Sequence, residues 1–367
     1  MSLRLDANCP ENISSGRSFS TILGVKGANG AGKTHLLKAL AFVRNFCVDS
    51  FNNDPADLIL FSSFFENAQP TEMYVEFAVN DVEYRYELEL TDAEVLRETV
   101  YRTKSRRSKL FERIGEKLST PKALNGLQAI KLRKNASLIS TAHQYERSEL
   151  SDIYNFFKSV FTNVGYTGRR DSYITLKFAA QLMDDHKHIL NFAKEFIAKC
   201  DIGVSDIEIQ KEEKEIASGT TRNKEYDYSP FFHHRAKGEN NVIHHGTESS
   251  GTKTLFRTLA IYKVALDVGG VVVFDEFDLH LHPHILPKIM ALFDDKSSNP
   301  KNAQLIFTTH DDRVIDILGR YRTVLVNKEE NESFAYRLDE IPGDIVRNDR
   351  SMLSAYNEGK IGGVPRE

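Results

Sequence analysis

Hydrophobic and polar residues alternate at every second position in two neighbouring stretches of the chain, residues 73–79 and 82–90. Asn80 and Asp81 separate these stretches, and both are common turn residues. Alternation of this kind predicts an antiparallel hairpin with one buried face and one solvated face. Residues 95–101 continue the pattern, so we expect a third strand there.

Three other apolar stretches show no alternation. Residues 21–25, 270–274 and 305–308 are short, mostly continuous apolar runs, which are typical of parallel strands buried on both faces. Apolar residues at helical spacing follow the first run, in residues 35–43, and precede the second, in residues 252–268. Strands that alternate with helices in this way predict an α/β fold.

The rest of the pattern predicts further elements. Residues 152–200 have helical spacing, whereas residues 218–241 are polar and are expected to form a loop. Gly269-Gly270 is expected to end the helix of residues 252–268. Residues 323–326 and 333–338 flank a turn of Asn and Glu residues and predict a late hairpin.

Residues 27–34, Gly-Ala-Asn-Gly-Ala-Gly-Lys-Thr, match the phosphate-binding pattern G-x-x-x-x-G-K-[ST] between a predicted strand and a predicted helix. Glycines let successive backbone N–H groups point at one anion, and the helix N-terminus adds positive potential. Lys33 is expected to reach the β- and γ-phosphates of ATP, and Thr34 to hold Mg²⁺. A glycine-rich turn without a ligand is the alternative. The other predicted nucleotide contacts are Asn29, Gly30, Ala31, Gly32 and His35.

Asp275 and Glu276 directly follow the buried run of residues 270–274. The carboxyl ends of strands are where α/β folds bind their ligands. Asp275 is expected to hold Mg²⁺ through water, and Glu276 to act as the general base for an attacking water. A strand that merely ends on acidic residues is the alternative, and the presence of a phosphate-binding loop favours the catalytic interpretation.

His310 follows the next buried run, residues 305–308. A histidine at this place can hydrogen-bond the γ-phosphate and help to hold the attacking water. The alternative is a histidine at a strand end that Asp311 caps. We favour the catalytic role because His310 and Glu276 each follow the end of a predicted parallel strand.

Ser249-Ser250-Gly251 stands at the beginning of the helix of residues 252–268. A helix terminus with small residues can offer a hydroxyl and N–H groups to a phosphate. Taken alone, Ser249 is only a good N-cap residue.

The order of these motifs resembles the ATP-binding-cassette ATPase head of the RecF, SMC and OLD type. In that family the Ser-x-Gly helix of one subunit covers ATP on the phosphate-binding loop of another, so the resemblance implies a homodimer or a higher homo-oligomer. It places Ser249, Gly251 and Asp278 against the nucleotide at the subunit seam. Gln144 is assigned to the glutamine that senses Mg²⁺, with Gln128 or a plain surface glutamine as alternatives. The implied fold is a P-loop NTPase head with a mixed sheet, an antiparallel β subdomain and a helical signature lobe.

A closer resemblance, to the AAA-fifteen group of bacterial and phage-defence ATPases, covers residues 20–367. It rests on residues 84–87, 109–113, 132–137, 248–253, 281–283 and 356–365. Glu248 departs from this group, which usually has leucine there. The resemblance implies an anti-phage ATPase with an effector encoded beside it, such as a Toprim-type nuclease.

These motifs divide the chain into four predicted parts. Residues 1–145 form the first part of the nucleotide-binding lobe, and residues 146–254 form the helical lobe that ends in the signature. Residues 255–340 form the second part of the nucleotide-binding lobe, and residues 341–367 form a C-terminal tail.

Composition adds limits on partners and location. The net charge of −4 gives no overall attraction to nucleic acid, although the basic residues between 102 and 117 leave such binding open. Three cysteines without close pairs indicate a reducing compartment, and no apolar run approaches the roughly 20 residues of a membrane span. We therefore expect a soluble cytoplasmic protein without a membrane partner. A DNA-repair ATPase and a non-hydrolysing ATP-dependent scaffold are the two alternative functions.

Overall fold

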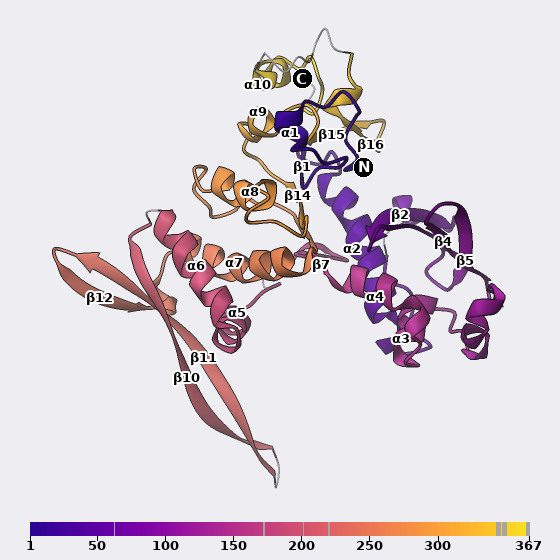
Figure 1. The fold of residues 1–367 in the computed structure, drawn as a ribbon, viewed down its shortest axis with the longest axis horizontal. Coiled ribbons are helices and arrows are strands. Elements are labelled where there is room, and N and C mark those ends of the chain that lie inside the picture. The colour runs from indigo at the N-terminus through magenta and orange to yellow at the C-terminus, as the bar shows by residue number, and fades with distance from the viewer. Residues whose placement is uncertain are drawn as a thin grey trace. The chain divides into compact units, whose positions relative to one another are not determined.

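The chain divides into two structural units that interleave along the sequence (Figure 1). The first unit combines residues 1–33 with residues 170–367, and the second contains residues 34–169. The computed structural model describes all residues except 62, 172, 201, 219–220, 343–345, 347–350 and 365–367, so the Pro365 of the tail motif lies outside the described residues. These boundaries follow contacts within the fold, and the four-part division by motifs stays a prediction.

A sheet with parallel strands at its centre organises the first unit. Within this unit the strand order is β16-β15-β1-β14-β13. β1 pairs in parallel with β14 and β15, β13 pairs in parallel with β14, and β16 is antiparallel to β15. The strands are β1 (Ile22–Gly27), β13 (Val271–Phe274), β14 (Gln304–Thr308), β15 (Thr323–Glu329) and β16 (Glu332–Arg337). The predicted buried strands and the late hairpin are thus confirmed, and the fold is a mixed α/β P-loop architecture.

Helix α7 (Ser250–Val268) leads into β13, as its apolar spacing predicted. It ends at Gly269, which has a φ of +70°, and a Cβ there would lie 2.7 Å from the carbonyl oxygen of Lys301. Only glycine fits this turn, so the helix stops at the predicted place. The other helices of this unit are α1 (Glu11–Ser14), α5 (Leu176–Asp185), α6 (Lys187–Lys199), α8 (Leu286–Asp294), α9 (Val314–Leu318) and α10 (Met352–Asn357).

A long two-stranded ribbon, β10 (Val204–Ser218) with β11 (Thr221–Ala236), extends beyond α5 and α6 in Figure 1. A short third strand, β12 (Glu239–His244), pairs with the end of β11 nearer the helices. The prediction of a loop over residues 218–241 is therefore wrong. Near the helices the ribbon buries Ile207 and Phe232, but at residues 211–214 and 224–226 its side chains are exposed and mostly charged. A ribbon solvated on both faces has no hydrophobic alternation, so its sequence resembles that of a loop.

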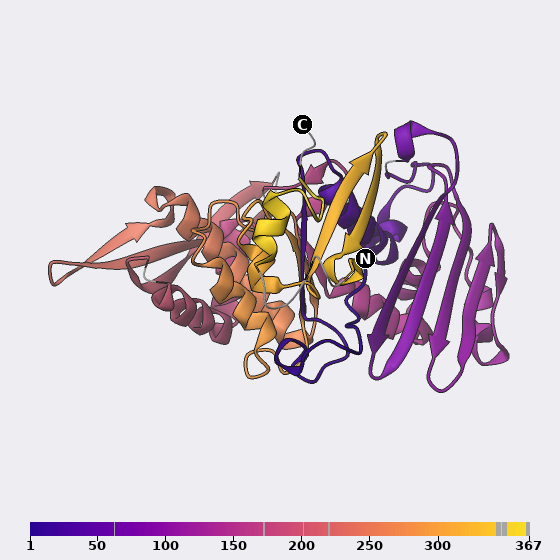
Figure 2. The ribbon, with the colours of Figure 1, turned by 90° about the horizontal axis from the view of Figure 1, so that it is seen from above.

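The second unit contains an antiparallel sheet in the order β2-β3-β4-β5-β6, whose strands lie side by side in Figure 2. Asn80 and Asp81 both have positive φ, +50° and +62°, and form the predicted hairpin turn. The predicted third strand is confirmed, and two further strands follow it that the sequence did not predict. The strands are β2 (Thr71–Val79), β3 (Val82–Leu90), β4 (Val95–Thr103), β5 (Arg107–Ile114) and β6 (Lys117–Ser119).

Helices α2 (Lys33–Asp49), α3 (Leu138–Gln144) and α4 (Ser151–Lys158) accompany this sheet. The continuous helical pattern predicted over residues 152–200 is interrupted after α4 by short strands, β7 (Val160–Thr162), β8 (Val164–Gly165) and β9 (Gly168–Arg169). The aromatic and branched residues of residues 153–164 suit strands as well as helices, so spacing alone did not separate the two.

A buried ion pair anchors the segment that begins α3. The guanidinium of Arg113 lies 3.6 Å from the carboxylate of Glu98, and both side chains are almost completely buried. Arg113 donates to the carbonyl of Ala136 at 2.7 Å, and Glu98 accepts from the N–H of Leu138 at 2.9 Å. Burial raises the pKa of Glu98 above its ordinary value, against the opposing effect of Arg113.

Among the described residues, no helix combines the length and the apolar character that crossing a membrane requires.

Candidate nucleotide-binding site

The predicted phosphate-binding loop leaves the end of β1 at Gly27. Gly30 and Gly32 have φ of +77° and +107°, a region that side chains rarely tolerate. A Cβ on Gly27 would lie 2.4 Å from the carbonyl oxygen of Val326, and a Cβ on Gly32 would lie 2.6 Å from the hydroxyl of Ser333. The loop therefore needs glycine at these positions, both for its turns and for its close contact with β15 and β16.

The side chain of Lys33 folds back over this loop. Its ammonium donates to the carbonyl oxygens of Gly27 and Ala28, at 2.9 and 3.1 Å, and the residue is only 9% exposed. Burial is the main cause that lowers the pKa of Lys33, and the neighbouring Lys26 lowers it further. Asp275 and Glu276 act in the opposite direction, so the predicted lysine and the predicted acids share one electrostatic environment.

The hydroxyl of Thr308, at the end of β14, joins the two acidic residues. It donates to Oδ1 of Asp275 at 2.6 Å and accepts from the backbone N–H of Glu276 at 2.7 Å. Asp275 is 3% exposed, so its carboxylate keeps a fixed direction. The sequence predicted no site role for Thr308, although a polar residue at the end of an apolar strand was a usable signal.

Glu276 and His310 come close together, as their positions after β13 and β14 predicted. Nε2 of His310 lies 3.8 Å from Oε1 of Glu276, which is longer than a hydrogen bond. The side chain of His310 is 53% exposed and that of Glu276 is 38% exposed, so a substrate can reach both. Glu276 has a φ of +49°, which is uncommon for a residue with a side chain and is often found at functional sites.

Asp278, two residues after Glu276, contacts the backbone of His310. Its two carboxylate oxygens accept from the backbone N–H of His310, at 3.3 and 3.2 Å. This contact fixes the start of the segment that carries the histidine. Whether Asp278 also lies at a seam between subunits stays a prediction.

Ser249 caps the beginning of α7. Its hydroxyl accepts from the N–H of Thr252 at 3.1 Å, so the N-cap role is confirmed, and the residue is exposed. Gly251 lies in the first turn, where a Cβ would be 2.8 Å from the carbonyl oxygen of His280. The small residue thus lets the helix approach the segment that follows Asp275 and Glu276.

Glu248 has a structural role that the sequence did not reveal. Its side chain is 6% exposed, and Oε1 lies 2.5 Å from Nε2 of His234 on β11. Oε2 accepts from the N–H of Ser249 at 3.1 Å. The carboxylate therefore bridges the base of the ribbon to the N-cap of α7, which a leucine could not do.

In a comparison with protein-family models, residues 22–316 match the family described as "AAA domain, putative AbiEii toxin, Type IV TA system". This chain belongs to that AAA-domain family. The match begins at β1 and extends past His310, so it includes the phosphate-binding loop, residues 249–251 at the start of α7 and both acidic residues. A search of curated proteins gives no significant match.

Among solved structures, the recombination mediator protein RecF with ATPrS in the RecFOR pathway is similar at 11% identity. The alignment covers 80% of this chain and 88% of that one, with a TM-score of 0.28. Similarity at this level is too weak to transfer either residues or function to the AAA-domain chain.

Three predicted site residues belong to the second unit. Thr34 and His35 continue α2 directly after Lys33, in the second unit. Gln144 ends α3 in the same unit, where it is exposed and its amide donates to Oδ1 of Asn52 at 3.4 Å. The rival Gln128 is also exposed and donates to the hydroxyl of Thr120 at 3.3 Å. The nucleotide and Mg²⁺ contacts assigned to Thr34, His35 and Gln144 stay predictions.

The donor chemistry of this centre fits a magnesium ion. Mg²⁺ prefers oxygen ligands and usually keeps several waters, with one or two carboxylates from the protein. Asp275 supplies a buried carboxylate that Thr308 orients, close enough to Lys33 to affect its pKa. The AAA-domain chain thus offers the kind of ligand that the sequence predicted.

Replacement of Thr308 by valine tests the bridge between the acidic residues. Thr308→Val keeps the shape of the side chain but removes both hydrogen bonds of its hydroxyl. We therefore expect the free energy of unfolding to fall by about 1–2 kcal/mol. Urea unfolding followed by circular dichroism measures this change.

Thr323→Val is the matched control. Thr323 is equally buried in β15, but its hydroxyl has no hydrogen-bond partner among the described residues. Its replacement should be neutral or slightly stabilising because an unsatisfied buried hydroxyl is lost. Equal effects of the two substitutions would contradict the bridging role.

Proposed function

We propose that this chain is a Mg²⁺-dependent ATPase whose ATP-driven association controls an effector protein in anti-phage defence. The observation that carries the ATPase proposal is the cluster of Lys33, Asp275, Glu276 and Thr308 at the strand ends of one sheet. A buried lysine inside a glycine-rich loop binds phosphate, and an accessible carboxylate beside it can activate water. The AAA-domain family supports the same chemistry.

Each residue has a defined task in this proposal. The loop N–H groups and the Lys33 ammonium bind the β- and γ-phosphates, and Asp275 holds the water shell of Mg²⁺. The ion neutralises phosphate charge when bound. Glu276 accepts a proton from the attacking water, and His310, 3.8 Å from it, hydrogen-bonds the γ-phosphate and orients that water.

The geometry at α7 supports a site shared between two copies. Ser249 is exposed at the N-terminus of a 19-residue helix, and that terminus has the positive end of the helix dipole. A second copy of the chain could therefore present the γ-phosphate of its bound ATP to this helix terminus. Association of two chains through ATP would then close the site, and hydrolysis would open it.

The effector proposal rests on the resemblance to defence ATPases and on the description of the family. That description names a putative toxin and a type IV TA system, which supports control of a toxic activity. The effector is proposed to be a neighbour-encoded protein such as a Toprim-type nuclease. A DNA-repair ATPase would instead bind DNA with strong salt dependence, and a scaffold would bind ATP without releasing phosphate.

Glu276→Gln tests the general base. The amide cannot accept the proton, so we expect phosphate release to slow by at least ~100-fold while ATP affinity is retained. Glu332→Gln, which changes an exposed carboxylate at the start of β16, is the control and should hydrolyse ATP normally. A normal rate in Glu276→Gln would refute the role of Glu276.

Mixing two inactive variants tests the shared site. Ser249→Arg should bind ATP but not hydrolyse it, because the large side chain fills the seam, and Lys33→Ala should not bind ATP tightly. A heterodimer of the two contains one intact site, so equal mixing should restore about a quarter of the wild-type rate. Persistent inactivity at every mixing ratio would argue against a site built from two copies.

A pull-down of the neighbour-encoded protein tests the control of an effector. Coupling requires that the effector binds the ATP-closed and open states with different affinity. Glu276→Gln should retain different amounts with and without ATP, whereas Lys33→Ala should retain equal amounts. Equal retention by Glu276→Gln in both conditions would contradict nucleotide-dependent control.

A further inference from the structure

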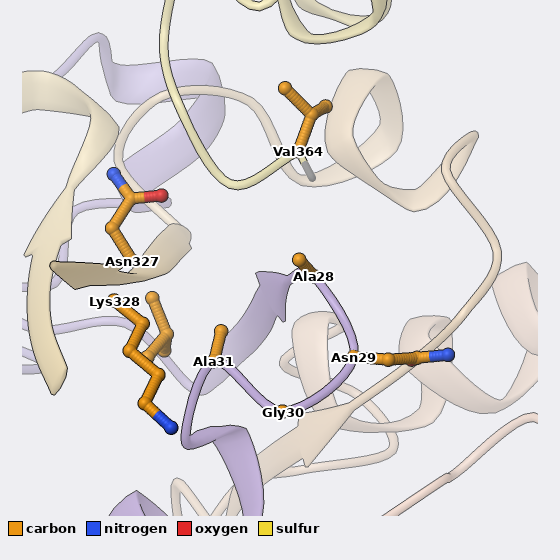
Figure 3. Close-up of a pocket in the computed structure, with 8 residues that line it drawn as sticks. Ala28, Asn29, Gly30, Ala31, Asn327, Lys328 and Val364 are labelled. Atoms are coloured by element: carbon orange, nitrogen blue, oxygen red, sulfur yellow. The ribbon is translucent and has the colours of Figure 1, made fainter. Parts of the chain in front are cut away.

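A cavity of about 300 Å³ adjoins the phosphate-binding loop within the first unit. Three segments line it: Ala28–Ala31 of the loop, Val326–Lys328 at the end of β15, and Val364 of the C-terminal tail. Figure 3 shows the tail and the loop on opposite sides of the cavity, with Asn327 on a third side. Residues far apart in the sequence thus line one open cavity beside the loop that is expected to bind phosphate.

Side-chain hydrogen bonds hold the tail in this place. The hydroxyl of Tyr336 donates to the carbonyl of Ile361 at 2.6 Å, and Asn327 donates to that hydroxyl at 2.8 Å. The amide oxygen of Asn327 accepts from the N–H of Gly363 at 2.6 Å, and Tyr356 donates to the carbonyl of Gly363 at 2.9 Å. Three of these bonds fix the backbone immediately before Val364, and the fourth joins the two side chains of β15 and β16 that hold it.

The close approach of the tail requires glycine. Gly362 and Gly363 have φ of +76° and +78°. A Cβ on Gly362 would lie 2.4 Å from the hydroxyl of Tyr336, and a Cβ on Gly363 would lie 2.9 Å from the ring of Tyr356. Both glycines belong to the motif of residues 356–365 in the tail. The proposed hydrolysis and association of two copies do not use this motif.

The lining of the cavity is mainly apolar. Ala28, Ala31, Val326 and Val364 contribute aliphatic side chains, and Lys328 adds its alkyl chain at an exposed position. The amide of Asn327 is already used by Tyr336 and Gly363. Such a surface suits a flat, weakly polar group, and the volume lies at the small end of ligand pockets.

We propose that this cavity receives the nucleoside of the nucleotide whose phosphates bind at the loop, and that Val364 packs on its base. The proposal rests on the proposed ATPase function and adds the place of base recognition to it. The loop residues Ala28–Ala31 form one wall of the cavity, so a base placed there stays close to phosphates on the loop. The C-terminal tail is thereby a part of the nucleotide site.

The test compares ATP with inorganic triphosphate, which has the phosphates but no base. Binding of each with Mg²⁺ is measured by calorimetry for the wild type, Val364→Trp, Val364→Ala and Lys33→Ala. The wild type should bind ATP at least ~10-fold more tightly than triphosphate, because base burial adds apolar contact. Val364→Trp fills the cavity and should reduce ATP affinity to that of triphosphate, with triphosphate binding unchanged.

A smaller substitution at Val364 and a control substitution elsewhere complete the test. Val364→Ala, which only shortens the side chain, should weaken ATP binding about 3- to 10-fold and leave triphosphate binding unchanged. Val268→Trp, at a 55%-exposed position on α7, is the control for an added indole and should bind both ligands as the wild type does. A full ATP preference in Val364→Trp or Val364→Ala overturns the proposal.

The outcomes also separate this proposal from the proposed function. If the wild type binds ATP, Lys33→Ala loses it and either Val364 variant keeps the full preference for ATP, the ATPase function stands and the tail site is refuted. If the wild type binds neither ATP nor triphosphate, the proposed function itself fails, and the base site fails with it.

Discussion

The parallel pairing of β1, β14 and β13 is the constraint on which the candidate site depends. Its register sets Phe274 beside Phe307, so the residues that follow these two strands meet at one edge of the sheet. Thr308 can therefore reach Asp275 and the backbone of Glu276 across a single strand spacing. Because all three strands run the same way, the phosphate-binding loop leaves β1 at that same edge. A register shift of one residue would turn these side chains to the opposite face of the sheet.

Buried charge explains why the loop is suited to an anion. Lys26, in β1 directly before the loop, is 3% exposed, but its ammonium is paired with Asp312 at 2.6 Å and donates to the carbonyl of Thr309 at 3.2 Å. The ammonium of Lys33 meets only carbonyl oxygens of the loop among its described hydrogen bonds, and burial lowers its pKa. A phosphate at the loop would supply the negative charge that favours the protonated lysine, so phosphate binding and the charge of Lys33 support each other.

Much of the fold followed from the sequence because its strands are of two clear kinds. Buried runs gave the parallel strands, and strict alternation with Asn80-Asp81 gave the β2–β3 hairpin. The β10–β11 ribbon was missed because its solvated half has no apolar face. Gly27, Lys33, Asp275 and Glu276 were found because their motifs are local in sequence. Thr308 and the pair of Glu248 with His234 were not, since their role comes from contacts between residues far apart in sequence.

The Glu248–His234 pair shows how the turn at residues 249–251, which begins α7, is held. A leucine before Ser249 could pack but could not accept a hydrogen bond, whereas Glu248 uses one oxygen for His234 and the other for the N–H of Ser249. A buried carboxylate is costly without partners, so both contacts are needed for it to be tolerated. His234 belongs to β11, which continues into the solvated ribbon, and Gly251 lies against the segment after Glu276. The turn is thus held by the ribbon on one side, and on the other it lies against the segment that follows Asp275 and Glu276, so its position depends on both.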